Sequence, residues 1–237
     1  MSEYKLARTL SYLDIETRRN HNVLPRPFFI EITGTPSAGK TTTIVELDKF
    51  FRRMGFRVLC PQEGAQVVRH IERTTPLYNL TTGLYALNIL IDLSQTHYYD
   101  FVIFDRCLFD AYCWMLYWEE KKKLNKDELV LIQAFFLSRF WINTIDVAYF
   151  MVCDPEKAME REQRIALTQK LGSYTNPETL KTLTLRYKRG FEALRPNFPQ
   201  LKLFDTTNKT EKGMVEELVA EEKKHLTTLT SIGKNLL

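Results

Sequence analysis

The sequence predicts an α/β protein in which helices cover both faces of a five-stranded parallel sheet, giving three layers. Two observations lead to this fold class. Short apolar segments alternate with longer segments of helical periodicity along most of the chain, the order typical of βαβ units. In addition, a chain of 237 residues, 44% of them hydrophobic, is long and apolar enough to bury the core of such a sheet.

Five segments are predicted to be strands because each is short, apolar and rich in β-forming residues. They are residues 28–33, 57–60, 100–105, 145–152 and 201–204. Parallel strands need crossover connections, so helices are expected between them. The predicted helices are residues 40–54, 64–73, 76–97, 109–118, 126–141, 178–194 and 210–226. Gly55 is the expected C-cap of the first helix, and Asp154 followed by Pro155 is the expected start of a further one.

The organisation along the chain predicts one main domain with an N-terminal extension. Residues 3–19 have weak helical periodicity and a proline-containing linker follows, so residues 1–24 are expected to form an extra N-terminal helix and linker. Residues 25–237 are expected to form the main domain. Within it, residues 168–177 are polar and include a glycine, which suits a helical lid around residues 155–177.

Composition and charge exclude several classes of protein. The hydrophobic content excludes a disordered chain, and 9 Gly with 9 Pro exclude a collagen-like one. The net charge is only +4, and the densest charged run, residues 119–123, mixes both signs, so a nucleic-acid partner is not expected. No apolar run reaches the roughly 18 residues of a membrane span, and the chain starts without a secretory signal. A cytoplasmic protein without a membrane partner is therefore expected, with its four cysteines as free thiols.

Residues 34–41 carry the most specific motif of the sequence. They match G-x-x-x-x-G-K-[ST] in full, between a predicted strand and a predicted helix. Glycines let such a loop curl around phosphates, and the start of the helix adds its positive dipole end. Lys40 would bind the β and γ phosphates, Thr41 would bind Mg²⁺, and Thr42 is a further phosphate contact. The motif predicts a P-loop NTPase fold whose nucleotide-binding residues are Gly34, Thr35, Pro36, Ser37, Ala38, Gly39, Lys40, Thr41 and Thr42.

Two carboxylates are expected beside this loop, because each follows a predicted strand and the carboxyl ends of parallel strands share one edge. Asp105 ends the third strand, where it could hold Mg²⁺ or accept a proton from a hydroxyl group; it could also cap the next helix. Glu63 follows the second strand and could accept a proton or bind a sugar hydroxyl; it could also be an exposed residue favoured by the helix dipole. The sequence leaves open which of the two is the base.

Two arginines on the helix after the fourth strand are the next candidates. Arg161 and Arg164 are three residues apart and therefore lie on one face of that helix. Guanidinium groups there could close over a transferring phosphoryl group and neutralise its charge. The alternative is a solvent-exposed face on which the arginines pair with Glu160 and Glu162.

These motifs, in this order, resemble those of the P-loop nucleoside and nucleotide kinases, most closely the thymidylate kinase and deoxynucleoside kinase branch. The resemblance covers roughly residues 28–206 and depends on the P-loop, Glu63, the Asp105-Arg106 pair and the two lid arginines. It implies ATP and Mg²⁺ as cofactors and phosphoryl transfer to a nucleoside or nucleoside monophosphate, with a homodimer left open. The catalytic set that it implies is Lys40, Glu63, Asp105, Arg106, Arg161 and Arg164.

The sequence departs from thymidylate kinases at two places. Pro36 and Ser37 stand where those enzymes usually have an acidic residue. After the Asp-Arg pair, Asp110 and then Cys113-Trp114 stand where they usually have a serine and then an Ala-Tyr pair. An acidic Asp110 would repel an acceptor phosphate, so the departures argue against thymidylate. They leave open a neutral nucleoside, another small hydroxylated molecule or a polynucleotide 5′ end.

A P-loop NTPase that acts as a regulatory switch is the alternative class of function. A GTPase would need Asn-Lys-x-Asp, whereas residues 208–211 read Asn-Lys-Thr-Glu. An AAA-type motor would need a second acidic residue after Asp105, where Arg106 stands. The intact Lys40 and Thr41 argue against a module that only binds nucleotide. Five aromatic residues could stack on a base, although each also suits the core: Tyr78, Tyr85, Phe109, Tyr112 and Trp114.

Overall fold

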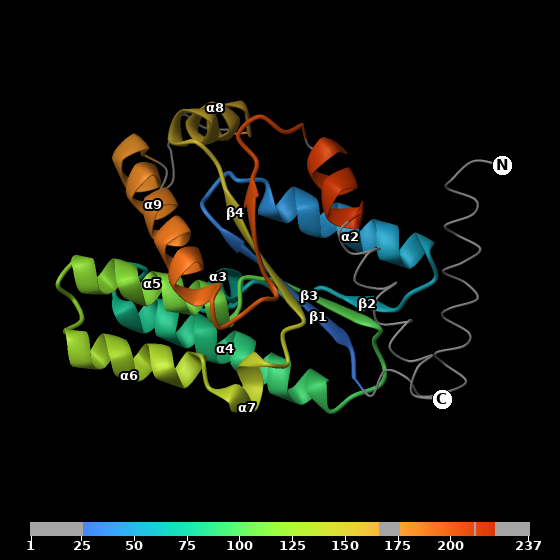
Figure 1. The fold of residues 1–237 in the computed structure, drawn as a ribbon, viewed down its shortest axis with the longest axis horizontal. Helices are drawn as coiled ribbons and strands as arrows, with labels where there is room; N and C mark the ends of the chain where they lie inside the picture. Colours follow the sequence, from blue (N-terminus) through green and yellow to red (C-terminus); the bar gives the residue numbers. More distant parts are fainter. Residues whose placement is uncertain (1–25, 166–175, 211, 221–237) are drawn as a thin grey trace.

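The computed structural model describes residues 26–165, 176–210 and 212–220, which form the predicted three layers (Figure 1). All five predicted strands are present, in one parallel sheet with the order β2-β3-β1-β4-β5. The strands are β1 (Phe28–Gly34), β2 (Val58–Leu59), β3 (Phe101–Asp105), β4 (Val147–Val152) and β5 (Leu201–Asp205). Because they all run in the same direction, the loops at their carboxyl ends come together at one edge.

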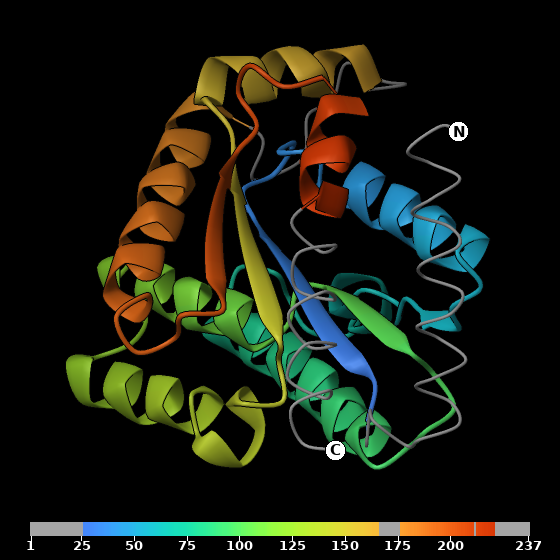
Figure 2. The same cartoon turned by 45° about the vertical axis from the view of Figure 1, so that its right-hand side comes forward.

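Helices cover both faces of the sheet, as the alternation along the sequence predicts (Figure 2). One face packs against α4, α5 and α9, and the other against α2 and the helical residues 212–220. The helices are α2 (Lys40–Arg53), α3 (Gly64–Val67), α4 (Pro76–Ser94), α5 (Leu108–Glu120), α6 (Lys126–Phe136), α7 (Arg139–Ile142), α8 (Pro155–Ile165) and α9 (Pro177–Leu194).

The core lies on both sides of β1, whose seven residues are all buried. Side chains alternate between the two faces of a strand, so Phe29 packs with the α4–α5–α9 layer while Ile30 and Ile32 pack with the α2 layer. A strand that is buried on both faces reads as an almost continuous apolar run, which is why it could be recognised from the sequence. Two polar residues interrupt this run, Glu31 and Thr33, and both are fully buried.

Two predicted helices are shorter in the structure than in the prediction. The helix expected over residues 64–73 ends at Val67, and the side chains of Arg69 and Arg73 donate to the free Gln66 and Ala65 carbonyl oxygens. The helix expected over residues 126–141 is divided into α6 and α7. Periodicity does not reveal such breaks, since the apolar pattern continues through them.

The capping signals are confirmed. The Asp154 side chain accepts hydrogen bonds from the amides of Glu156 and Lys157, so that α8 begins at Pro155. At the end of α2, Gly55 adopts a φ of 87° and donates to the Arg52 carbonyl. These contacts fix where α8 begins and where α2 ends.

The expected N-terminal extension, residues 1–24, lies outside the described residues, as does the part of the expected lid from residue 166 to residue 175. The first part of that lid region is α8. In the described ranges, no helix combines the length and the apolar character that crossing a bilayer requires.

Candidate functional site

The P-loop has the backbone geometry that phosphate binding requires. Gly34 has a φ of 134°, and a Cβ atom there would lie 1.8 Å from the Met151 carbonyl oxygen of β4, so only glycine fits. Gly39, in the left-handed conformation with a φ of 88°, is the N-cap of α2 and has no side chain to cap the first amides. The first turn of α2 also has no acidic residue. These N-terminal amides are therefore suited to an anionic ligand.

Lys40 projects from the first position of α2 into this loop. Its side chain is buried, and Nζ donates a hydrogen bond of 2.7 Å to the Thr35 carbonyl oxygen. Burial, together with the nearby charge of Arg106, lowers the pKa of Lys40 to about 8, although Asp105 acts in the opposite direction. A phosphate group in the loop would favour the charged form of this amine.

Thr41 and Asp105 form a pair of oxygen ligands next to the loop. Thr41 Oγ1 lies 3.5 Å from Asp105 Oδ2, at the limit of a hydrogen bond. Asp105 Oδ1 is buried and has no hydrogen-bond partner within the described residues. A hydroxyl and a carboxylate fit Mg²⁺, which takes one or two protein oxygens together with water and phosphate oxygens. The described residues contain no cluster of three or more His, Cys, Asp or Glu side chains that could hold a metal by themselves.

Arg106, the residue after β3, is the centre of a second cluster. It has a φ of 69°, unusual for a residue other than glycine, and its amide bonds the Ile32 carbonyl. Its guanidinium group lies 3.3 Å from Glu63, 2.7 Å from Asp110 and 2.9 Å from the Tyr187 hydroxyl. The structure thus brings Glu63 and Tyr187, each more than 40 positions away in the chain, to Arg106 and its neighbour Asp110.

Burial raises the pKa of Glu63, and Asp105 raises it further, while Arg106 and Lys40 act in the opposite direction. A raised pKa makes a carboxylate a better proton acceptor at neutral pH.

Asp110, in the first turn of α5, is held from three sides. The Arg106 guanidinium, the Thr33 hydroxyl and the Tyr187 hydroxyl all donate to its Oδ1 atom. The donors come from the loop after β3, from β1 and from α9, and the carboxylate is almost completely buried. Because three separate elements hold this carboxylate, its position is strongly constrained.

A second buried carboxylate, Glu31, fixes the start of α5 beneath this cluster. It accepts hydrogen bonds of 2.9, 3.2 and 2.9 Å from the amides of Cys107, Phe109 and Asp110. Burial raises the pKa of Glu31 to about 8, although the three amides lower it. By satisfying the amides at the helix start, Glu31 orients the segment that carries Arg106 and Asp110.

The P-loop contributes to two of the cavities at this edge of the sheet. The large cavity has a volume of about 730 Å³ and is lined, among others, by Lys40, Thr41, Thr42, Arg161, Asn208 and Met214. The small cavity has a volume of about 160 Å³ and is lined, among others, by Glu63, Arg73, Tyr78, Arg106, Asp110 and Trp114. Of the five aromatic residues considered for base stacking, Tyr78 and Trp114 line the small cavity.

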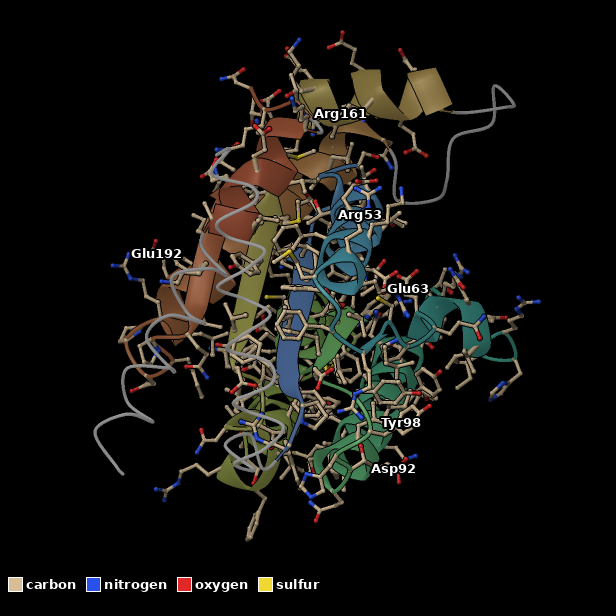
Figure 3. The ribbon with its side chains drawn as sticks, turned by 90° about the vertical axis from the view of Figure 1, so that its right-hand side faces the viewer. Arg53, Glu63, Asp92, Tyr98, Arg161 and Glu192 are labelled. Carbon is tan, nitrogen blue, oxygen red and sulfur yellow. The ribbon has the colours of Figure 1, made fainter. Side chains whose placement is uncertain are left out.

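Arg161 joins α8 to the rest of the large cavity. Its guanidinium group donates to the carbonyl oxygens of Thr206, at 2.6 Å, and Ser37, at 3.4 Å. Glu162, the next residue, accepts a hydrogen bond of 2.7 Å from the Ser37 hydroxyl, so α8 contacts the P-loop through two adjacent residues. Arg161 therefore lies on the P-loop side of α8, while Glu63 lies well away from it, beside the segment leading to α4 (Figure 3). The side chain of Arg164 lies outside the described part of the chain.

Sequence reasoning missed three contributors to the second cluster. Glu31 and Thr33 carried a signal, because two polar residues in a strand buried on both faces must have partners. Tyr187 carried none, since a tyrosine on the apolar face of a helix is indistinguishable from an ordinary core residue. Asp110 was recognised as acidic, but its partners Arg106 and Tyr187 appear only in the folded chain.

Comparison with known proteins agrees with this geometry. Residues 29–185 match the AAA_28 family, described as an AAA domain. A solved structure of deoxyadenosine kinase from M. mycoides with the products dCMP and a flexible dCDP matches with a TM-score of 0.61 and 16% sequence identity. A structure of deoxyadenosine kinase from M. mycoides with bound dCTP matches with a TM-score of 0.56 and 17% identity. Both alignments cover 83% of this chain and 100% of the other chain. No curated protein matches the sequence.

At 16% and 17% identity, these two matches show a shared fold. They confirm the expected P-loop nucleotide-binding fold and its resemblance to the deoxynucleoside kinase branch at that level. The family match extends over well more than half of the 237 residues. The chain therefore belongs to the AAA_28 family of AAA domains and has the P-loop fold that is also found in deoxyadenosine kinases.

Proposed function

We propose that this protein is a kinase that uses ATP and Mg²⁺ to phosphorylate a nucleoside or nucleoside monophosphate. The observation that carries the proposal is a second, smaller cavity that shares Pro36 with the P-loop and is lined by Glu63 and Arg106, while Asp105 contacts Thr41 of the loop. A protein that only binds or hydrolyses a nucleotide needs the P-loop but no second cavity. A phosphotransferase also needs a place for the acceptor, with a proton-accepting group at the reacting oxygen.

The large cavity is the proposed donor site. The amides at the start of α2 and Lys40 would hold the β and γ phosphates of ATP, with Thr42 as a further contact. Thr41 and Asp105 would hold Mg²⁺, which supplies charge neutralisation on the phosphate oxygens. Arg161 ties α8 to the P-loop, and together with Arg164 it would serve the closing lid.

The small cavity is the proposed acceptor site, and Glu63 is the proposed base. Glu63 lines this cavity, whereas Asp105 lies against Thr41, and this separation supports different roles for the two carboxylates. In the transfer, the acceptor oxygen bonds to the γ-phosphorus while the bond from that phosphorus to the bridging oxygen of ADP breaks. Glu63 takes the proton of the acceptor hydroxyl group, and Arg106 orients Glu63 through their 3.3 Å contact.

The likeness to deoxyadenosine kinases supports a nucleoside or nucleotide as the acceptor, because those structures have the same fold around bound dCMP or dCTP. Tyr78 and Trp114 offer ring faces to a base within the small cavity. Another small hydroxylated molecule remains the alternative acceptor class, since the cavity is lined by groups that recognise hydroxyls generally.

The experiment is a transfer screen with radiolabelled ATP. Purified protein is offered nucleosides, nucleoside monophosphates, other small hydroxylated metabolites and 5′-hydroxyl oligonucleotides, and the labelled product is identified. A Lys40→Ala protein provides the control for contaminating kinases. Label in a nucleoside or nucleotide product is the expected result. If no acceptor is labelled while ATP still binds, the kinase proposal is overturned in favour of the regulatory switch.

A further inference from the structure

The acceptor side of the site contains a cation, Arg106, whose Nε and Nη1 atoms already have partners. The Arg106 guanidinium group bonds Asp110 at 2.7 Å and the Tyr187 hydroxyl at 2.9 Å, and it lies 3.3 Å from Glu63. Two carboxylates therefore surround a single guanidinium group at the inner end of the small cavity. Its positive charge is already balanced before any acceptor enters.

The ion pair between Arg106 and Asp110 is not easily broken. Asp110 also accepts the hydroxyl hydrogen bonds of Thr33 and Tyr187, and the amide of Asp110 itself is bonded to Glu31. For Nη1 of Arg106 to turn to a ligand, it would have to give up its bond to Asp110, which β1 and α9 hold in place. A buried carboxylate that loses its cationic partner is strongly destabilised, so the pair is expected to stay together.

The charge balance bears on the chemistry of the acceptor. If the acceptor is a monophosphate, its attacking atom is a phosphate oxygen, which is already ionised and needs no base. It would have to sit beside Glu63, with Asp110 behind Arg106, and both carboxylates would repel it. A neutral hydroxyl group has the opposite requirement, because it must lose a proton, and Glu63 is placed to take it. Arg73 also lines this cavity, with its guanidinium 5.7 Å from the centre of the Tyr78 ring, but its side chain is exposed.

We propose that Asp110 determines acceptor specificity: by holding and neutralising Arg106, it makes the small cavity select an uncharged hydroxyl acceptor over a phosphorylated one. The inference rests on the proposed kinase function and narrows its acceptor to the nucleoside type. Tyr187 and Thr33 act as positioning residues that keep Asp110 on Arg106.

The first test compares matched acceptors with the wild-type protein. Each nucleoside is assayed beside its own 5′-monophosphate, and kcat/KM is measured for both. The expected result is a preference of at least about 10²-fold for the nucleoside. A preference for the monophosphate would overturn this inference while leaving the kinase function standing. Failure to label either compound would overturn the kinase function itself.

The second test asks whether Asp110 is responsible. Asp110→Asn removes the negative charge and is expected to reduce the nucleoside preference at least about tenfold, because part of the Arg106 charge becomes available to a phosphate. Asp92→Asn is the matched control, since Asp92 is exposed on α4, well away from Glu63 (Figure 3), and should leave the preference unchanged. Tyr187→Phe keeps all charges but removes a hydrogen bond that holds Asp110 on Arg106. We expect it to reduce the nucleoside preference by a smaller factor than Asp110→Asn does.

A purely structural role for Asp110 predicts a different pattern. In that case the Asp110→Asn and Tyr187→Phe variants would lose activity toward both acceptors by the same factor. The ratio of kcat/KM for the nucleoside to kcat/KM for its monophosphate would then stay at the wild-type value. An unchanged ratio in both variants overturns the proposal. If Asp110→Asn does not fold, Tyr187→Phe and the wild-type ratio still decide the question, because neither depends on that variant.

Discussion

The large and the small cavity are built by different means, although they share one edge of the sheet. Around the large cavity, the phosphate-binding elements come from one continuous stretch, residues 34–42, and are mainly backbone groups held by glycine geometry and a helix start. Around the small cavity, the decisive groups are side chains from separate segments, above all Glu63, Arg106, Asp110 and Tyr187.

This difference predicts how substitutions in the two halves will affect activity. The proposed donor half binds phosphates through general features of a P-loop, so a substitution there should reduce activity with every acceptor equally. The proposed acceptor half depends on its own pattern of charged side chains, so the effect of a substitution there should depend on which acceptor is offered. Each of the following predictions is a way to break or refine that distinction.

The largest effect is expected from Lys40→Ala, because it removes the cation that would bind the transferring phosphates. We expect kcat/KM to fall by about 10³-fold for all acceptors alike, with a near-native fold. Labelled-ATP transfer and circular dichroism measure the two quantities. A loss that differed between acceptors would contradict the division between the halves.

Glu63→Gln should have the next largest effect. An amide of nearly the same shape cannot take a proton, so kcat should fall by about 10²–10³-fold while KM for ATP stays unchanged. Steady-state kinetics with each substrate varied in turn provide the measurement. Should kcat remain at the wild-type level, Glu63 is not the base, and Asp105 becomes the candidate.

Asp105→Asn tests the metal assignment on the donor side. An amide oxygen is a weaker ligand for Mg²⁺ than a carboxylate, so we expect turnover to fall by about 10²-fold and the Mg²⁺ concentration for half-maximal activity to rise. A Mg²⁺ titration of both proteins checks this. Wild-type turnover at saturating Mg²⁺ would overturn the metal assignment; a capping role does not explain Asp105, because Glu31 and not Asp105 bonds the amides at the start of α5.

The pH dependence of ATP binding should report on Lys40. Burial lowers its pKa to about 8, so in the free protein the amine loses its charge as the pH rises through that value. Affinity for ATP should therefore be nearly constant from pH 6.5 to 7.5 and fall by close to tenfold per unit above pH 8. Binding titrations from pH 6.5 to 9.5 measure the profile. Lys40→Ala should bind more weakly, without this decline.

The smallest effect on transfer is expected from Thr33→Val, which acts through stability. Thr33 is fully buried, and its hydroxyl donates to Asp110, so replacing it with a methyl group of similar size should cost about 1–3 kcal/mol. Thermal unfolding should show a Tm lower by roughly 2–4 °C per kcal/mol.

Thr43→Val is the matched control for this prediction. Thr43 is equally buried, but its hydroxyl has no hydrogen-bond partner within the described residues. This variant should be neutral or more stable than the wild type. Equal losses in the two variants would mean that the Asp110 contact contributes nothing measurable.

Much of the fold could be predicted from the sequence because its signals are local. The strands from β1 to β5 are short apolar runs, and the caps at Asp154 and Gly55 depend on residues two or three positions away. The end of α3 at Val67 and the break between α6 and α7 could not be predicted. Periodicity carries no information about either break, because the apolar pattern continues through both.

By itself, the sequence determined the P-loop and its position after the first strand, and from these it predicted a phosphate-binding site. The loop depends on backbone conformation and a helix start, which the eight residues 34–41 specify. Only the tertiary structure decided that Glu31, Thr33 and Tyr187 hold Asp110 in place and that Asp110 holds Arg106. Hydrogen bonds and ion pairs act over about 3 Å, so which of these side chains become partners depends on how the sheet and α9 pack together.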